Sequence, residues 1–157
     1  MATNRGTHPP LTAVALSSKD AKHVLEFVLV PLHDGRHADW HSYEIHMKNL
    51  ESGRCWSLVS AEHMLFLDKV YEPEVPAISA SLKRAVEDDE PFTFTPADER
   101  DFILDVAADP DGLRVRLQFD FRPAPSEFGW PNGVLVDRAE AHRFAESLEA
   151  TFKALES

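Results

Sequence analysis

Cysteine, basic side chains and long apolar runs are all scarce in this chain. Of its 157 residues only Cys55 is a cysteine, so no internal disulfide can form. No segment approaches the roughly 20 consecutive apolar residues that cross a membrane as a helix. The first ten residues contain no apolar run, so we expect no signal peptide. Together these absences predict a soluble, cytoplasmic protein that folds without disulfides.

The short motifs that mark common enzyme classes are missing as well. The sequence contains no GxSxG, GxGxxG, HExxH or CxxC motif, and no phosphate-binding P-loop. We therefore expect a protein that is not an enzyme and that needs no cofactor.

What the sequence has in excess is negative charge. The formal net charge is −11, and residues 1–50 contribute none of it. Between Glu72 and Asp111 there are twelve acidic residues but only three basic ones. Such a surface repels nucleic acid and anionic lipid, so we expect no nucleic-acid partner and no membrane association. It favours a basic protein partner, because opposite charges speed encounter.

Two groups of residues are candidates for contacting such a partner. The acidic candidates are Glu72, Glu74, Glu87, Asp88, Asp89 and Glu90. The aromatic candidates are Phe128 and Trp130 in the segment PSEFGWPNG, because aromatic residues in loops are common interface anchors. Each group has a simpler alternative. The acids would serve only solubility, and the aromatic loop would pack onto the core as a lid.

Hydrophobic patterning predicts one α+β domain over residues 11–157, preceded by a disordered tail at residues 1–10. Apolar or alternating runs predict strands at 11–18, 23–32, 40–50, 55–59, 91–96, 101–109 and 112–123. Polar residues on one face of several strands indicate antiparallel hairpins, in one sheet or in two. The sequence DPDG is a strong turn signal between the last two strands.

Helical periodicity is found in the middle and at the end of the chain. A helical pair is expected in the middle, the first helix over 61–71 with Ser60 as its N-cap and the second after the two prolines that follow. The acidic run at 87–90 should make the second helix either fray or stop sharply, because carboxylates oppose the helix dipole there. The last helix is expected to begin at a capping box of Asp137 and Glu140 and to pack on the sheet.

The segment HDGRHADWHSYEIH raises the question of a metal site. His33, His37 and His41 are spaced four residues apart, which on a helix would place them on one face, as in some zinc sites. The Asp-Gly pair within the segment is instead a hairpin signal. Two interpretations stay open: a small-ligand or metal-binding domain, enzymatic or not, that uses His33, His37 and His41, and exposed histidines of a turn and a strand.

Two further features concern single types of side chain. Cys55 is expected in the core as a small apolar residue, with a reactive thiol as the alternative. Arg114, Arg116 and Arg122 alternate along one strand face, and we expect them to pair with neighbouring acids across the sheet.

The second half of the chain resembles a known type of small bacterial protein. The segments SAEHMLFLDKV, LDVAADPDGLRVRLQFDF and VLVDRAEAHRFAESLEATFKAL are similar in pattern to the WapI-type immunity proteins and related uncharacterised families. The resemblance covers residues 55–157 and consists of apolar patterns, so it assigns no functional residue. It implies a binding protein that neutralises a toxin. Another possibility left open is a structural subunit that buries its aromatic loop in a homodimer.

Overall fold

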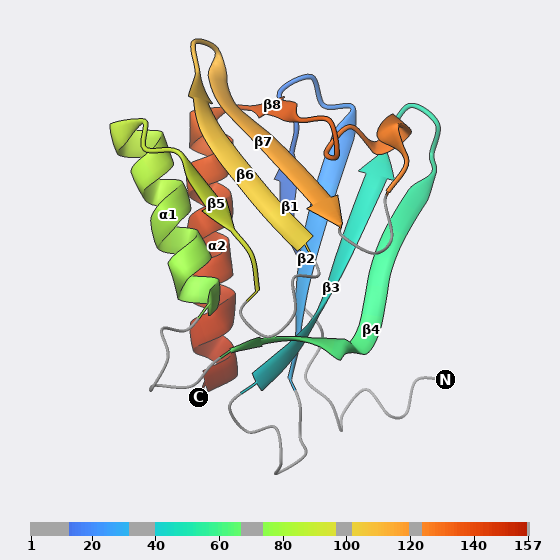
Figure 1. Ribbon diagram of the computed structural model, residues 1–157, viewed down its shortest axis with the longest axis vertical. Helices are drawn as coiled ribbons and strands as arrows, with labels where there is room; N and C mark the ends of the chain where they lie inside the picture. The colour runs from blue at the N-terminus through green and yellow to red at the C-terminus, as the bar shows by residue number, and fades with distance from the viewer. Residues whose placement is uncertain (1–12, 32–39, 67–73, 97–101, 120–123, 157) are drawn as a thin grey trace.

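The computed structural model describes residues 13–31, 40–66, 74–96, 102–119 and 124–156 (Figure 1). In chain order the elements are β1 (Ala13–Ser17), β2 (His23–Pro31), β3 (Trp40–Asn49), β4 (Cys55–Phe66), α1 (Glu74–Asp88), β5 (Phe92–Phe94), β6 (Phe102–Asp109), β7 (Gly112–Phe119), the 3₁₀ turn η3 (Ser126–Phe128), β8 (Val134–Val136) and α2 (Arg138–Glu156). The predicted tail at residues 1–10 lies outside the described residues. Within the described part, no helix is long and apolar enough to cross a membrane.

The strands form two antiparallel sheets of four strands each. The order is β1-β2-β3-β4 in the first sheet and β5-β6-β7-β8 in the second, so every strand pairs with its neighbour in the sequence. The chain therefore consists of two successive units, each of four antiparallel strands followed by a helix. This confirms the predicted α+β fold with antiparallel hairpins and a C-terminal helix, and the hairpins form two sheets.

Alternation of apolar and polar residues decides which face of each strand turns inward. In β3, Tyr43, Ile45 and Met47 are buried, while the residues between them are partly exposed. Strand β7 follows the same rule, with its apolar residues buried and its two arginines exposed. Both patterns agree with the sequence prediction for these strands.

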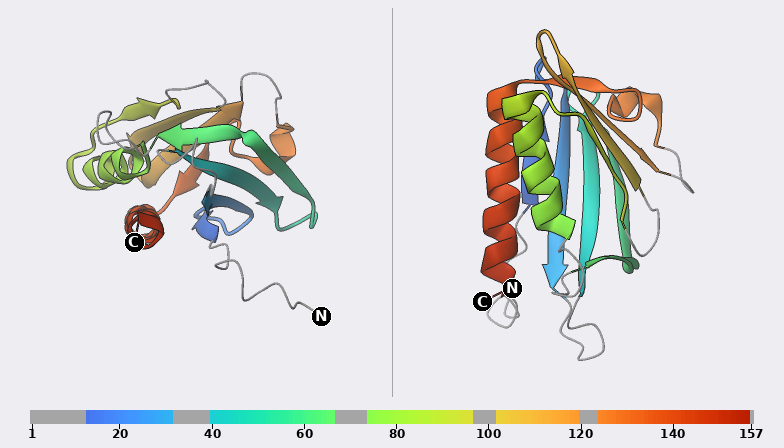
Figure 2. Two further views of the ribbon diagram at one scale, coloured as in Figure 1. Left: turned by 90° about the horizontal axis from the view of Figure 1, so that it is seen from below. Right: turned by 60° about the vertical axis from the view of Figure 1, so that its left-hand side comes forward.

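The inner faces of the two sheets share one hydrophobic core. The ring of Tyr43 from the first sheet meets Phe102 from the second edge-on, with the ring centroids 5.6 Å apart. Trp56 and Phe119 make a second contact between the sheets, with centroids 4.6 Å apart. Helices α1 and α2 pack against each other along one side of both sheets and complete the core (Figures 1 and 2). The buried apolar residues of the helices include Ile78, Leu82 and Ala85 on α1, and Ala141, Phe144, Leu148 and Phe152 on α2.

Helix α2 also covers the free edge of β1. The backbone N–H of Ser17 donates a hydrogen bond of 2.9 Å to Glu140 Oε2. Arg143 donates both to Glu140 and to the backbone carbonyl of Ala15. Because open N–H and C=O groups on an edge strand invite pairing with other chains, this cover protects the first sheet. Glu140 is therefore engaged with β1 and Arg143, and not in the capping box predicted with Asp137.

One predicted helix is a strand. The sequence predicts a helix over 61–71, but β4 continues through this segment to Phe66. Its second half pairs with the start of β3, where Trp40 lies opposite Phe66, beyond a register shift between Ser42 and Glu44. Pairing with β3 is a tertiary interaction that outweighs the local helix propensity. In the described residues the middle of the chain thus has one helix, α1, where two were predicted.

Candidate functional site

The predicted metal site falls outside what the structure describes. His33 and His37 are not among the described residues, and of His41 only the backbone is described, in β3 opposite Pro31. Among the described residues, no group of three or more His, Cys, Asp or Glu side chains could hold a metal ion. A site formed by His33, His37 and His41 therefore stays a prediction.

The aromatic loop before β8 is packed onto the core. Phe128 and Trp130 are 2% and 0% exposed. The N–H of Leu117 donates to the carbonyl of Trp130 at 2.9 Å, and the Asn49 side chain donates to that of Glu127 at 2.7 Å, so the loop is tied to both sheets. The two aromatic side chains form a lid on the core, which is the lid interpretation of this loop and corrects the other interpretation, in which they contact a partner.

The six acidic candidates divide by their place along α1. Glu74 begins the helix and is 6% exposed, so it is not available to a partner; a carboxylate in the first turn complements the helix dipole. Glu72 lies outside the described residues. The other four, residues 87–90, are exposed at the C-terminal end of α1. The helix ends at Asp88 and Asp89 has a positive φ of 55°, which is the sharp stop predicted for this run.

Basic side chains connect the end of α1 to the start of α2, and the β1–β2 turn to the β6–β7 turn and to the start of α2. Arg138 donates at 2.8 Å to a carbonyl in the last turn of α1 and pairs with Asp89 at 2.6 Å. Lys19, in the β1–β2 turn, donates at 2.9 Å to the carbonyl of Asp111 and lies 3.7 Å from Asp137. These contacts place the end of α1, the start of α2 and both turns at one end of the molecule, the upper end in Figure 1.

We call this surface the acidic end. It contains the seven carboxylates of Glu87, Asp88, Asp89, Glu90, Asp109, Asp111 and Asp137. Four basic side chains pair with carboxylates of this surface, namely those of Lys19, Arg84, Arg114 and Arg138. Among the described residues, none forms an ion pair with Glu87 or Asp88. The acidic end therefore carries a net negative charge, and two of its carboxylates have no ion pair within the described part of the chain.

A two-part hollow lies beside this end. One part, of about 610 Å³, is on the face of β5, β6 and β7 that points away from the core. The other, of about 440 Å³, lies between the β1–β2 turn and the loop before β8. Arg114, Asn132 and Gly133 line both parts, so the two parts meet at these residues. We call the two parts together the trough.

The charged residues of the trough are paired to different degrees. Arg116 pairs with Asp105 at 2.9 Å, and Thr93 donates to the same carboxylate at 2.6 Å. The hydrogen bond from Thr93, with a further contribution from Arg116, holds the pKa of Asp105 below its ordinary value. Arg114 lies 3.6 Å from Asp109, which is longer than a hydrogen bond. Pairing across the sheet is thus confirmed for these two arginines; the third arginine predicted on this face lies outside the described residues.

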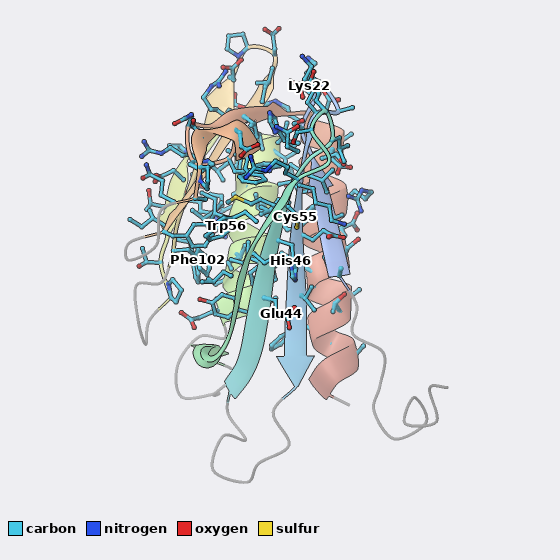
Figure 3. The ribbon with its side chains drawn as sticks, turned by 90° about the vertical axis from the view of Figure 1, so that its right-hand side faces the viewer. Lys22, Glu44, His46, Cys55, Trp56 and Phe102 are labelled. Atoms are coloured by element: carbon cyan, nitrogen blue, oxygen red, sulfur yellow. The ribbon has the colours of Figure 1, made fainter. Side chains whose placement is uncertain are left out.

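The outer face of the first sheet carries a polar network that sequence analysis missed. His46 lies between two partners: its Nε2 is 2.9 Å from Glu44 Oε1, and its Nδ1 is 2.6 Å from Ser57 Oγ (Figure 3). On the same face, Lys48 pairs with Glu26 at 2.8 Å. The only signal in the sequence is the alternating placement of Glu44 and His46. Ser57 joins them through the register of β3 with β4, which the sequence does not specify.

The order serine, histidine, carboxylate is that of a hydrolase triad, but the surroundings differ. Acyl transfer needs preorganised N–H donors around the oxyanion and a hollow that holds the substrate. Ser57 lies on the outer face of the sheet and lines neither part of the trough. We therefore interpret the network as cross-strand pairing that stabilises the sheet. Cys55, whose Sγ is 3.8 Å from Ser57 Oγ, is exposed, which corrects the prediction of a core cysteine.

Comparisons with family models, with curated proteins and with solved structures find no significant match. The resemblance to WapI-type immunity proteins therefore stays a prediction, and function has to be inferred from the geometry of this chain.

Proposed function

We propose that the protein is a non-enzymatic binding domain that neutralises a basic protein partner, as an immunity protein neutralises a toxin. The observation that supports this proposal is the acidic end. There, four consecutive carboxylates at the end of α1 are exposed together, next to those of the β6–β7 turn and the start of α2.

The way these carboxylates are held favours recognition over a role in solubility alone. Arg138 is hydrogen-bonded to the last turn of α1 and paired with Asp89, so it fixes the chain where the helix stops. Glu87 and Asp88 lie directly before this anchored point and form no ion pair with a described residue. Backbone that is already positioned loses little conformational freedom on binding. The acidic end therefore presents these carboxylates on an anchored backbone.

Electrostatics also predict how such a complex would behave. Opposite fields raise the association rate, and dissolved salt screens them over a Debye length of about 10 Å at 0.1 M ionic strength. Association should therefore slow as salt rises, while a complex held mainly by apolar contacts would change little.

The proposal can be tested by capturing the partner with a tagged, full-length chain in its native host. The charge-reversed variant is Glu87→Lys with Asp88→Lys. The matched control is Glu51→Lys with Glu146→Lys, which makes the same change in net charge at two exposed carboxylates outside the acidic end. We expect the wild type and the control to retain a basic protein at low salt and to lose it at high salt, and the charge-reversed variant to lose it at low salt. Mass spectrometry identifies what is retained.

Neutralisation needs a second step with the identified protein. Expressed alone it should arrest growth, and co-expression of the wild type or of the control should restore growth, while the charge-reversed variant should not. Circular dichroism shows whether each variant is folded. An acidic partner, or a partner held equally well by the charge-reversed variant, would contradict the proposal.

A further inference from the structure

The trough contains one strong hydrogen-bond donor that the protein leaves unused. The side chain of Arg114 is 53% exposed, and its closest acidic neighbour, Asp109, is 3.6 Å away. Within the described part of the chain its guanidinium makes no hydrogen bond. A guanidinium carries five N–H donors in a planar fork that matches a carboxylate or a phosphate. Arg114 is thus available to an anion at the point where the two parts of the trough meet.

The carboxylates near Arg114 already have other partners. Asp105 accepts hydrogen bonds from Thr93 and Arg116. Asp109 accepts one from the N–H of Asp111. Asp109 uses its Oδ1 for this hydrogen bond, and its Oδ2 faces Arg114 at 3.6 Å, so an external anion would compete for Arg114 with this one long ion pair. The trough is lined by three basic side chains, those of Arg114, Arg116 and Lys19, and by two carboxylates, those of Asp105 and Asp20, each of which accepts a hydrogen bond from a neighbouring side chain.

The wall of the trough opposite β7 is formed by the backbone of the loop before β8, which lies close to the ring of His23. Gly129 and Gly133 have φ angles of 78° and 100°, which L side chains rarely adopt. A Cβ atom at Gly129 would lie 2.8 Å from the ring of His23, so the loop and the ring are in direct contact. Trp130, between these glycines, is buried in the core and holds the loop in place. The wall is therefore preformed and has no side chain at the two glycines.

Part of the lining of the larger part is apolar. Pro91, Phe92 and Ala107 contribute to it, and Ala107 lies directly opposite Arg114 in the register of β6 with β7. The larger part has a volume of about 610 Å³, which is in the range of small-ligand sites, roughly 300–1,000 Å³. An anionic group at Arg114 would leave the rest of a ligand lying against this apolar lining.

We propose that the trough binds an amphipathic organic anion, whose phosphate or carboxylate group is held by Arg114 and whose apolar part lies against Pro91 and Phe92. This inference does not rest on the proposed function, because it concerns an anion held by Arg114 in the trough and not a basic partner held by the exposed carboxylates of the acidic end.

Titration of the full-length ¹⁵N-labelled protein with phenyl phosphate, benzoate and inorganic phosphate, at constant ionic strength, tests the inference. We expect saturable amide shifts at Phe92, Arg114, Asn132 and Gly133, and weaker binding of inorganic phosphate, because it has no apolar part. Whether phenyl phosphate or benzoate binds more tightly identifies the anionic group. Arg114→Ala should weaken binding about tenfold or more, since charge-assisted hydrogen bonds are lost, and Arg114→Lys should weaken it less.

Arg84→Ala is the matched control, because it removes one exposed arginine that does not line the trough. Its affinity for each probe should equal that of the wild type. Three results would overturn the inference: no saturable shift with any probe, equal affinities for the wild type and Arg114→Ala, or an equal loss in Arg84→Ala, which would indicate unspecific attraction. Circular dichroism of each variant confirms that the fold is intact.

Discussion

The outer faces of the two sheets differ in how their charged groups are satisfied. On the first sheet, His46 has partners on both ring nitrogens and Lys48 is paired with Glu26. On the second sheet, Arg116 is paired in the same way, but Arg114 is left without a hydrogen bond among the described residues, beside a hollow. The comparison shows that a dense polar network is weak evidence for a site. A charged donor that lies next to a hollow without a hydrogen bond to the protein is better evidence, because it can exchange water for charge-assisted hydrogen bonds to an anion.

The largest effect is expected for Trp130→Ala, which tests whether the core holds the wall of the trough in place. The side chain is fully buried under the loop that walls the trough. Its loss should lower the free energy of unfolding by about 3–5 kcal/mol, as is typical for large core aromatic residues. Urea denaturation followed by circular dichroism measures the change. A loss below about 1 kcal/mol would mean that the loop is not a core lid and that the wall of the trough is not fixed.

A smaller change targets the wall alone. Gly129→Ala places a Cβ at positive φ and 2.8 Å from the His23 ring, while Gly53→Ala has a similar φ of 76° but nothing within 4 Å. We expect Gly53→Ala to cost about 1–2 kcal/mol from its backbone conformation, and Gly129→Ala to cost about 1–3 kcal/mol more from overpacking. Denaturation of both variants measures the difference. Equal costs would show that His23 does not press on the loop.

A pH-dependent test concerns the first sheet, whose β1 edge is covered by Glu140. The hydrogen bond from Arg143, together with that from Ser17, lowers the pKa of Glu140 from its ordinary value of 4.5. A carboxyl group whose pKa is lower in the folded than in the unfolded state stabilises the fold at pH values above the unfolded-state pKa. This stabilisation is lost as the pH falls through the folded-state pKa. At pH 7 the free energy of unfolding of the wild type should be about 1 kcal/mol higher than that of Glu140→Gln.

The difference between these two proteins should shrink once the pH falls below 4.5, the ordinary value for this group. Urea denaturation of both proteins over a pH series measures it, and the other carboxylates cancel because both proteins contain them. A difference that stays constant with pH would show that the carboxylate of Glu140 is not the group that seals the edge.

The smallest expected effect is that of Ser57→Ala. Cross-strand pairs contribute about 0.2–1 kcal/mol, and His46 is exposed enough for water to replace the lost partner. Phenyl phosphate binding in the trough should be unchanged. A fluorophosphonate probe sharpens the comparison further, because it reacts with activated serines: we expect no labelling of the wild type. If the probe labels the wild type but not Ser57→Ala, Ser57 is an activated serine and the first sheet carries a reactive site.

The spacing of apolar residues along the sequence predicted the strands and helices whose form depends on neighbouring residues in the chain. Alternation identified the inward faces of β3 and β7, and helical spacing identified α1 and α2. Strand β4 was predicted only in part, because its second half is held by pairing with β3, which no window of the sequence contains. The acidic end of α1 was also predicted, since a run of carboxylates can hardly be buried.

The trough could not be predicted for the same reason as the second half of β4. Its residues come from four separated segments: the β1–β2 turn, β5, the β6–β7 hairpin and the loop before β8. Pairing of Arg116 with an acid was expected, but which arginine would be left over depends on the register of β6 with β7. The burial of Trp130 likewise depends on where both sheets meet, so the sequence favoured a lid but left exposure of its loop open.

Because α2 covers the free edge of β1, this edge is unprotected during part of the synthesis of the chain. Ser17 and Glu140 are 123 positions apart, so β1 is covered by a helix that leaves the ribosome much later. All four strands of the first sheet can form hairpins early, yet the edge of β1 stays open to neighbouring nascent chains until α2 arrives. The first unit therefore does not mature before the second. Synthesis of this protein leaves an interval of exposure that ends only when α2 has emerged.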